Sequence, residues 1–78
     1  MPPDIRQLVR RGTAAFEAGE YSEAETLLLR VLDGNTGYAN VYHMLGVIAS
    51  LRGASQRAAD LFRRALALNP RYGEAQLN

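Results

Sequence analysis

One repeated spacing constrains the fold of this chain more than any other feature of its sequence. Small residues, leucines and polar residues recur at a single fixed distance along the chain: Gly12 as Gly46, Ala15 as Ala49, Gly19 as Gly53, Ala24 as Ala58, Leu27 as Leu61, Arg30 as Arg64, Leu32 as Leu66, Asn35 as Asn69 and Tyr38 as Tyr72. Self-similarity at one fixed spacing indicates stacked structural repeats. We therefore expect residues 5–38 and 39–72 to adopt one shape, with residues 73–78 opening a further, truncated helix.

Each repeat contains the signals for two helices and none for a strand. Apolar residues recur at helical spacing, and no segment alternates strictly between apolar and polar residues. Asp4 is expected to cap the first helix, which ends near Ala18. Ser22 and Glu25 form a predicted capping box for a second helix that ends near Leu32.

The second repeat follows the same plan, and the whole chain is predicted to be all-α. Its first helix is expected to start at Tyr38 or Asn40 and to end at Leu51. Its second helix is predicted to be capped by Ser55 and to end near Leu68, where Asn69-Pro70 stops it.

A helix-turn-helix unit of about 34 residues resembles the tetratricopeptide repeat (TPR), whose pattern is W-x2-L-G-x2-Y, A-x3-F and P. The second repeat carries Tyr42-x2-Leu45-Gly46-x2-Ala49, then Ala58-x3-Phe62, then Pro70. The first repeat departs from the pattern at Leu8, Arg11, Ala15 and Thr36. The resemblance implies one TPR domain over residues 1–78, a fragment of a right-handed α-solenoid.

Small residues in this pattern have a packing role, because two helices approach closely only where one presents little side chain. We expect Gly12 and Gly46 to lie opposite Ala24 and Ala58, with leucine and phenylalanine side chains beside the contact. The predicted repeat-packing residues are Gly12, Ala24, Leu28, Leu45, Gly46, Ala58, Phe62 and Ala65.

The resemblance also implies a concave groove, lined by the first helix of each repeat, that takes a peptide or a helix. The residues carried onto this groove are Val9, Thr13, Phe16, His43, Met44, Val47 and Leu51, with Leu77 continuing the row. Two interpretations of this apolar row stay open. It packs as ordinary core, or it receives an amphipathic helix or another copy of the chain.

One well-known recognition mode of the family is not expected in this chain. That mode grips the acidic C-terminal tail of heat-shock chaperones with a carboxylate clamp of lysine, asparagine and arginine. The matching positions here are Val9, Thr13, Met44, Glu74 and Asn78, which lack the clamp.

Catalysis, cofactors and metals find little support in the sequence. His43 is the only histidine, there is no cysteine, and no metal-ligand spacing surrounds His43. The acids Glu17, Glu20, Glu23 and Glu25 are interpreted as a solvated turn and helix start. We therefore predict that the chain is not an enzyme and binds no cofactor.

Net charge and hydropathy argue against two classes of binding partner, nucleic acid and membrane. The net charge of +1 gives no long-range attraction for nucleic acid, and no apolar run approaches the roughly 20 residues that span a bilayer. We expect a cytoplasmic, non-enzymatic adaptor or assembly scaffold that binds a protein or peptide. The alternatives are a self-association module and a regulatory TPR segment of a larger enzyme.

Overall fold

The computed structural model describes residues 4–34 and 37–71, which form helices and turns. Four helices follow one another: α1 (Ile5–Glu17), α2 (Tyr21–Leu32), α3 (Ala39–Leu51) and α4 (Ser55–Leu68). No strand occurs in these two ranges, so the all-α prediction is confirmed. The predicted truncated helix at 73–78, with Leu77 and the clamp positions Glu74 and Asn78, lies outside the described residues, as do Asn35, Thr36 and Tyr72.

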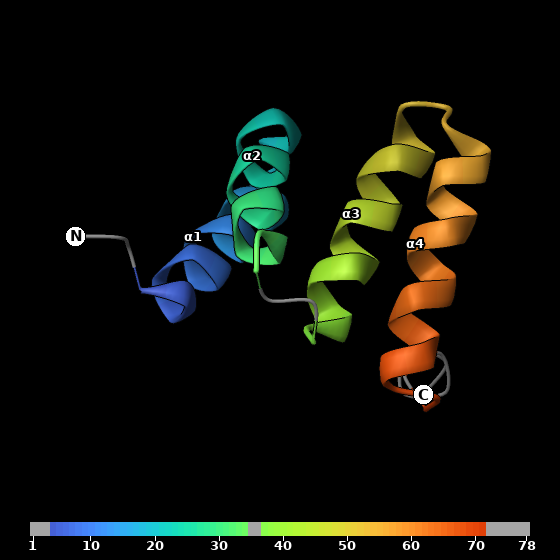
Figure 1. The fold of residues 1–78 in the computed structure, drawn as a ribbon. Coiled ribbons are helices and arrows are strands. Elements are labelled where there is room, and N and C mark those ends of the chain that lie inside the picture. Colours follow the sequence, from blue (N-terminus) through green and yellow to red (C-terminus); the bar gives the residue numbers. More distant parts are fainter. Residues whose placement is uncertain (1–3, 35–36, 72–78) are drawn as a thin grey trace. The chain divides into compact units, whose positions relative to one another are not determined.

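The chain divides into two compact units, residues 1–36 and residues 37–78. In the first unit α1 packs against α2, and in the second α3 packs against α4 (Figure 1). Each unit is thus a helical hairpin. None of the described helices has the length and apolar character needed to cross a bilayer.

The two hairpins turn in the same way. Their turns each contain a glycine in the left-handed region, Gly19 with φ 79° and Gly53 with φ 80°, a conformation that favours glycine. The residue after each glycine donates its backbone N–H to the carbonyl oxygen five residues earlier, at 2.9 Å in both cases: Glu20 to Ala15, and Ala54 to Ala49. Equivalent residues of the two repeats therefore make the same bonds.

These tight turns also explain two errors in the predicted helix starts. The capping box at Ser22 is wrong, because α2 begins at Tyr21 with Glu20 at the N-cap and no side-chain capping bond. Ser55 is likewise the first residue of α4, with Ala54 at the N-cap. The bond that closes each turn sets the residue after the glycine at the helix start, whatever its side chain.

The cap of α1 was predicted correctly. The Asp4 carboxylate accepts a hydrogen bond from the backbone N–H of Arg6 at 2.9 Å, which satisfies one of the free donors at the helix start. This bond, together with the charge of the Arg6 guanidinium, holds the pKa of the Asp4 carboxyl below its usual value.

Each hairpin is closed by a large side chain that lies against a glycine backbone. A Cβ on Gly12 would lie 2.7 Å from Cδ2 of Leu28, and a Cβ on Gly46 would lie 2.7 Å from Cε1 of Phe62. The alanines expected opposite these glycines are not among their three nearest contacts. Instead, the leucine and the phenylalanine reach directly over the bare backbone.

We expect the two glycines to differ in their tolerance of alanine. Leu28 is completely buried and cannot move aside, so Gly12→Ala should lower the free energy of unfolding by about 1–3 kcal/mol. Phe62 is only half-buried, and its ring can turn outward. The free energy of unfolding of Gly46→Ala should therefore lie within about 1 kcal/mol of the wild-type value, because the higher helix propensity of alanine offsets part of the loss.

Urea unfolding followed by circular dichroism measures both changes. Gly37→Ala is the control, because nothing beyond its two chain neighbours lies within 4 Å of a Cβ at that position. Equal losses for Gly12→Ala and Gly46→Ala would contradict the difference between the two contacts.

Candidate functional site

The first hairpin holds three of the predicted groove residues on one side of α1. Val9, Thr13 and Phe16 follow one another at intervals of four and three residues, and all three are half-buried. The Phe16 ring meets the ring of Tyr21 edge-on, with centroids 5.8 Å apart. This contact anchors the aromatic side chain at the start of α2 and leaves part of the row accessible.

The second hairpin holds the other four on α3, in two different environments. His43 and Val47 are half-buried, and Leu51, one turn further on, is 61% exposed. Met44 is only 6% exposed and belongs to the interior. The accessible row of α3 is therefore His43, Val47 and Leu51, spaced four residues apart along one face.

The predicted repeat-packing residues lie mainly in the interior. Of the eight, Phe62 is half-buried and the other seven are buried. The buried residues are Gly12, Ala24, Leu28, Leu45, Gly46, Ala58 and Ala65. The ring of Phe62 also lies beside His43, with ring centroids 5.5 Å apart and an angle of 49° between the ring planes. Phe62 therefore links the hairpin contact to the surface row of α3.

His43 lies in a partly desolvated position on α3. Partial burial removes water from the imidazole and disfavours its charged form, so the pKa of His43 lies below its usual 6.5. No group of three metal-ligating side chains converges anywhere in residues 4–34 and 37–71. The arrangement around His43 favours a neutral, half-apolar contact surface near pH 7.

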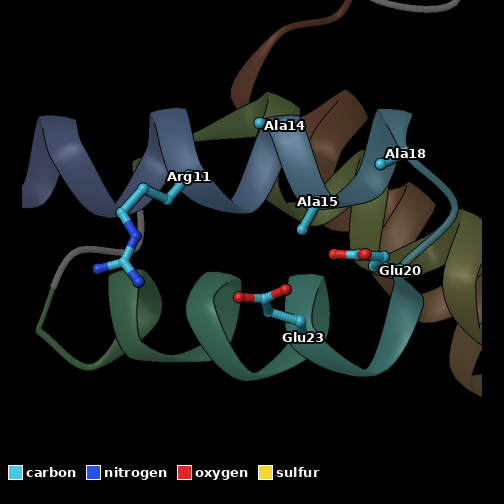
Figure 2. A pocket seen from close by; sticks show the side chains of 6 residues that line it. All are labelled: Arg11, Ala14, Ala15, Ala18, Glu20 and Glu23. Atoms are coloured by element: carbon cyan, nitrogen blue, oxygen red, sulfur yellow. The ribbon is translucent and has the colours of Figure 1, made fainter.

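A hollow of about 260 Å³ lies on the first hairpin, between α1 and the start of α2 (Figure 2). Its lining, which we call the α1 hollow, consists of Arg11, Ala14, Ala15, Ala18, Glu20 and Glu23. Figure 2 shows Arg11 extending from α1 toward α2 at one end, with the carboxylates of Glu20 and Glu23 further along. The alanines contribute a floor with short side chains.

The α1 hollow occupies positions that are filled in the second hairpin. Leu45 and Ile48 are the repeat equivalents of Arg11 and Ala14, and they are only 2% and 0% exposed. In the first hairpin the equivalent side chains are charged or small, and they are exposed. The same backbone thus carries an apolar, buried face on α3 and a polar, hollowed face on α1.

The residues that line this hollow are scattered in the sequence, and no single motif contains them. In the sequence, Arg11 is a departure from the TPR pattern and a neighbour of Arg10, and Glu20 and Glu23 belong to the predicted solvated turn and helix start. The available signal was the comparison of the two repeats, in which the apolar positions of one become Arg11 and Ala14 in the other.

Comparison with known proteins gives a similarity to part of a much longer protein. The chain is 36% identical over 59 residues to a protein of Pseudomonas aeruginosa named probable biofilm formation methyltransferase WspC. The match covers 76% of this chain and 14% of that protein, so this chain corresponds to a small part of its relative. No family model matches the chain. No solved structure matches it either.

We expect the stability of the second hairpin to depend on His43 below neutral pH. Well above pH 6.5 the imidazole is neutral in both the folded and the unfolded chain. As the pH falls, the unfolded chain takes up the proton first, because the folded pKa is lower, and stability is lost until the pH passes the folded pKa.

Urea unfolding at pH 7.5 and pH 5.5 tests this dependence. His43→Phe keeps a ring beside Phe62 but cannot be protonated, so its stability should change less between the two pH values. An identical pH dependence in the variant and the wild type would rule out His43 as the cause.

Proposed function

We propose that this chain is a tetratricopeptide-type module that acts by binding protein and has no catalytic chemistry of its own. The observation that carries the proposal is the equivalence of the two hairpins. Their glycine turns and closing hydrogen bonds recur at the repeat spacing, and so do the glycine contacts with Leu28 and Phe62. A two-helix repeat of this length resembles the TPR unit.

The finer architecture belongs to the same proposal. We take residues 5–38 and 39–72 as two repeats of one TPR domain, a fragment of a right-handed α-solenoid. Repeats of this type serve as binding surfaces, because stacking leaves an extended face of their first helices free.

The partner-binding residues in this proposal are the accessible rows of α1 and α3. Five of these residues are half-buried, namely Val9, Thr13 and Phe16 on α1 and His43 and Val47 on α3. Leu51 is largely exposed. Such rows offer apolar atoms at intervals of three and four residues, which match the spacing of contacts along an amphipathic helix. We therefore infer a helical or peptide partner with apolar anchors, and no role for nucleic acid, membrane or a chaperone tail.

A second candidate is a regulatory segment of a larger enzyme, and the similarity to the methyltransferase-named protein favours it. The matching stretch makes up 14% of that protein, so a segment similar to this chain occurs there within a much longer polypeptide. In this version the module binds a substrate protein or a regulator on behalf of the enzyme. The length of the native reading frame separates the two candidates.

Val47→Arg should abolish capture of the partner and leave the helices intact. The half-buried Val47 lies in the middle of the α3 row, and a charge there would have to be desolvated on binding. Affinity capture with the full-length parent should recover at least about tenfold less partner, and circular dichroism should show unchanged helix content.

Ala67→Arg is the matched control, because it adds the same charge at an exposed position of α4. Capture that is unchanged by Val47→Arg would count against the proposed surface. Equal loss in both variants would indicate a general effect of charge.

A further inference from the structure

One side of α4 carries two leucines and an arginine that the described part of its own hairpin leaves accessible. We define the α4 strip as Arg57, Leu61 and Leu68, which lie four and seven positions apart and so share one side of the helix. Leu68 is 45% exposed and Leu61 is half-buried. The residue equivalent to Leu61 in the first hairpin, Leu27, is only 6% exposed.

The α1 hollow carries two acidic side chains, opposite in charge to Arg57 of the α4 strip. Its floor is made of alanines and has room for a larger side chain, and its far end carries the carboxylates of Glu20 and Glu23 (Figure 2). Neither of these carboxylates makes a hydrogen bond or ion pair with another side chain in the described part of the chain. The guanidinium of Arg57 is also without a carboxylate partner among the described residues.

We propose that the α4 strip of one copy of this chain seats in the α1 hollow of a second copy. This proposal rests on the proposed function, since it names a partner for a module that works through protein contacts. Leu61 of one copy would lie over Ala14 and Ala18 of the next, with Arg57 facing Glu20 and Glu23. The leucine removes apolar surface from water, and the arginine pairs with two acids.

Charge decides between this contact and its symmetric alternative. Two α4 strips that faced each other would offer Arg57 no carboxylate, because the strip itself carries none. Seating the strip in the hollow supplies the two carboxylates of Glu20 and Glu23 to Arg57. The hollow of the second copy is therefore the better complement.

The contact has a distinctive consequence for assembly. The strip and the hollow are different surfaces, so each copy keeps one free strip or one free hollow after pairing. Such head-to-tail contacts build open chains of increasing length. The average mass should rise with protein concentration and fall with added salt, which screens exposed ion pairs.

Sedimentation velocity of charge-reversed chains tests the pairing. Glu20→Arg combined with Glu23→Arg reverses the hollow, and Arg57→Glu reverses the strip. Either change alone should raise the apparent dissociation constant about tenfold or more, because attraction becomes repulsion. An equimolar mixture of the two variants should associate again, since a basic hollow then meets an acidic strip.

Arg63→Glu is the control for the strip. Arg63 lies on another face of α4, where it pairs with Asp60 at 3.3 Å, and its reversal should leave association unchanged. Circular dichroism checks that each variant is helical, and a single chain with all three reversals should associate as the wild type does. This restored chain keeps the test informative even if one variant is less stable.

The outcomes separate this proposal from the proposed function. A wild-type chain that stays monomeric at high concentration overturns the proposal, as does a mixture that fails to associate while the wild type does. Neither result affects capture by the α1 and α3 rows, because Val47 belongs to neither the strip nor the hollow. Loss of partner capture in Val47→Arg would still support the proposed function.

Discussion

The structure of each hairpin depends on a close contact between a bare glycine backbone and one large side chain. Leu28 lies over Gly12 and Phe62 lies over Gly46, at distances that leave no room for a Cβ unless the side chain shifts. This contact brings the two helices of a hairpin together, and so determines which of their faces point inward. The rows of α1 and α3, the α1 hollow and the α4 strip are the faces that remain outside.

The two hairpins have the same turn geometry, but different side chains are exposed on them. At equivalent positions the first carries Arg11 and Ala14 and the second carries Leu45 and Ile48, which changes a polar, exposed face into a buried one. The reverse holds for Leu27 and Leu61, where the later residue is the more exposed. The first hairpin therefore offers a polar hollow and the second offers the accessible leucines of the α4 strip, although both hairpins contain the same glycine turn.

The periodicity of the sequence was sufficient to predict the all-α class, most helix ends and the glycines that break the chain between helices. These features depend on helix formation and turn geometry, which are local. The starts of α2 and α4 were misjudged because the side chains of Ser22 and Ser55 suggested caps, whereas the hydrogen bond that closes each glycine turn sets the start. Within the predicted apolar row of α1 and α3, Met44 is buried and the other residues are at least partly accessible. The spacing of the row alone leaves open whether it packs as core or binds a partner. The hollow could not be predicted from the sequence, because its lining residues come from two helices and a turn.

The sequence by itself determined that the chain forms two similar helical hairpins, because the same spacing of small and apolar residues occurs in both halves. Only the tertiary structure decided which of those residues are accessible. Exposure depends on how side chains from different helices cover one another, as when Phe62 reaches past Gly46 to the ring of His43. A linear pattern records the spacing of side chains along each helix, and the packing of the helices decides which of them reach solvent.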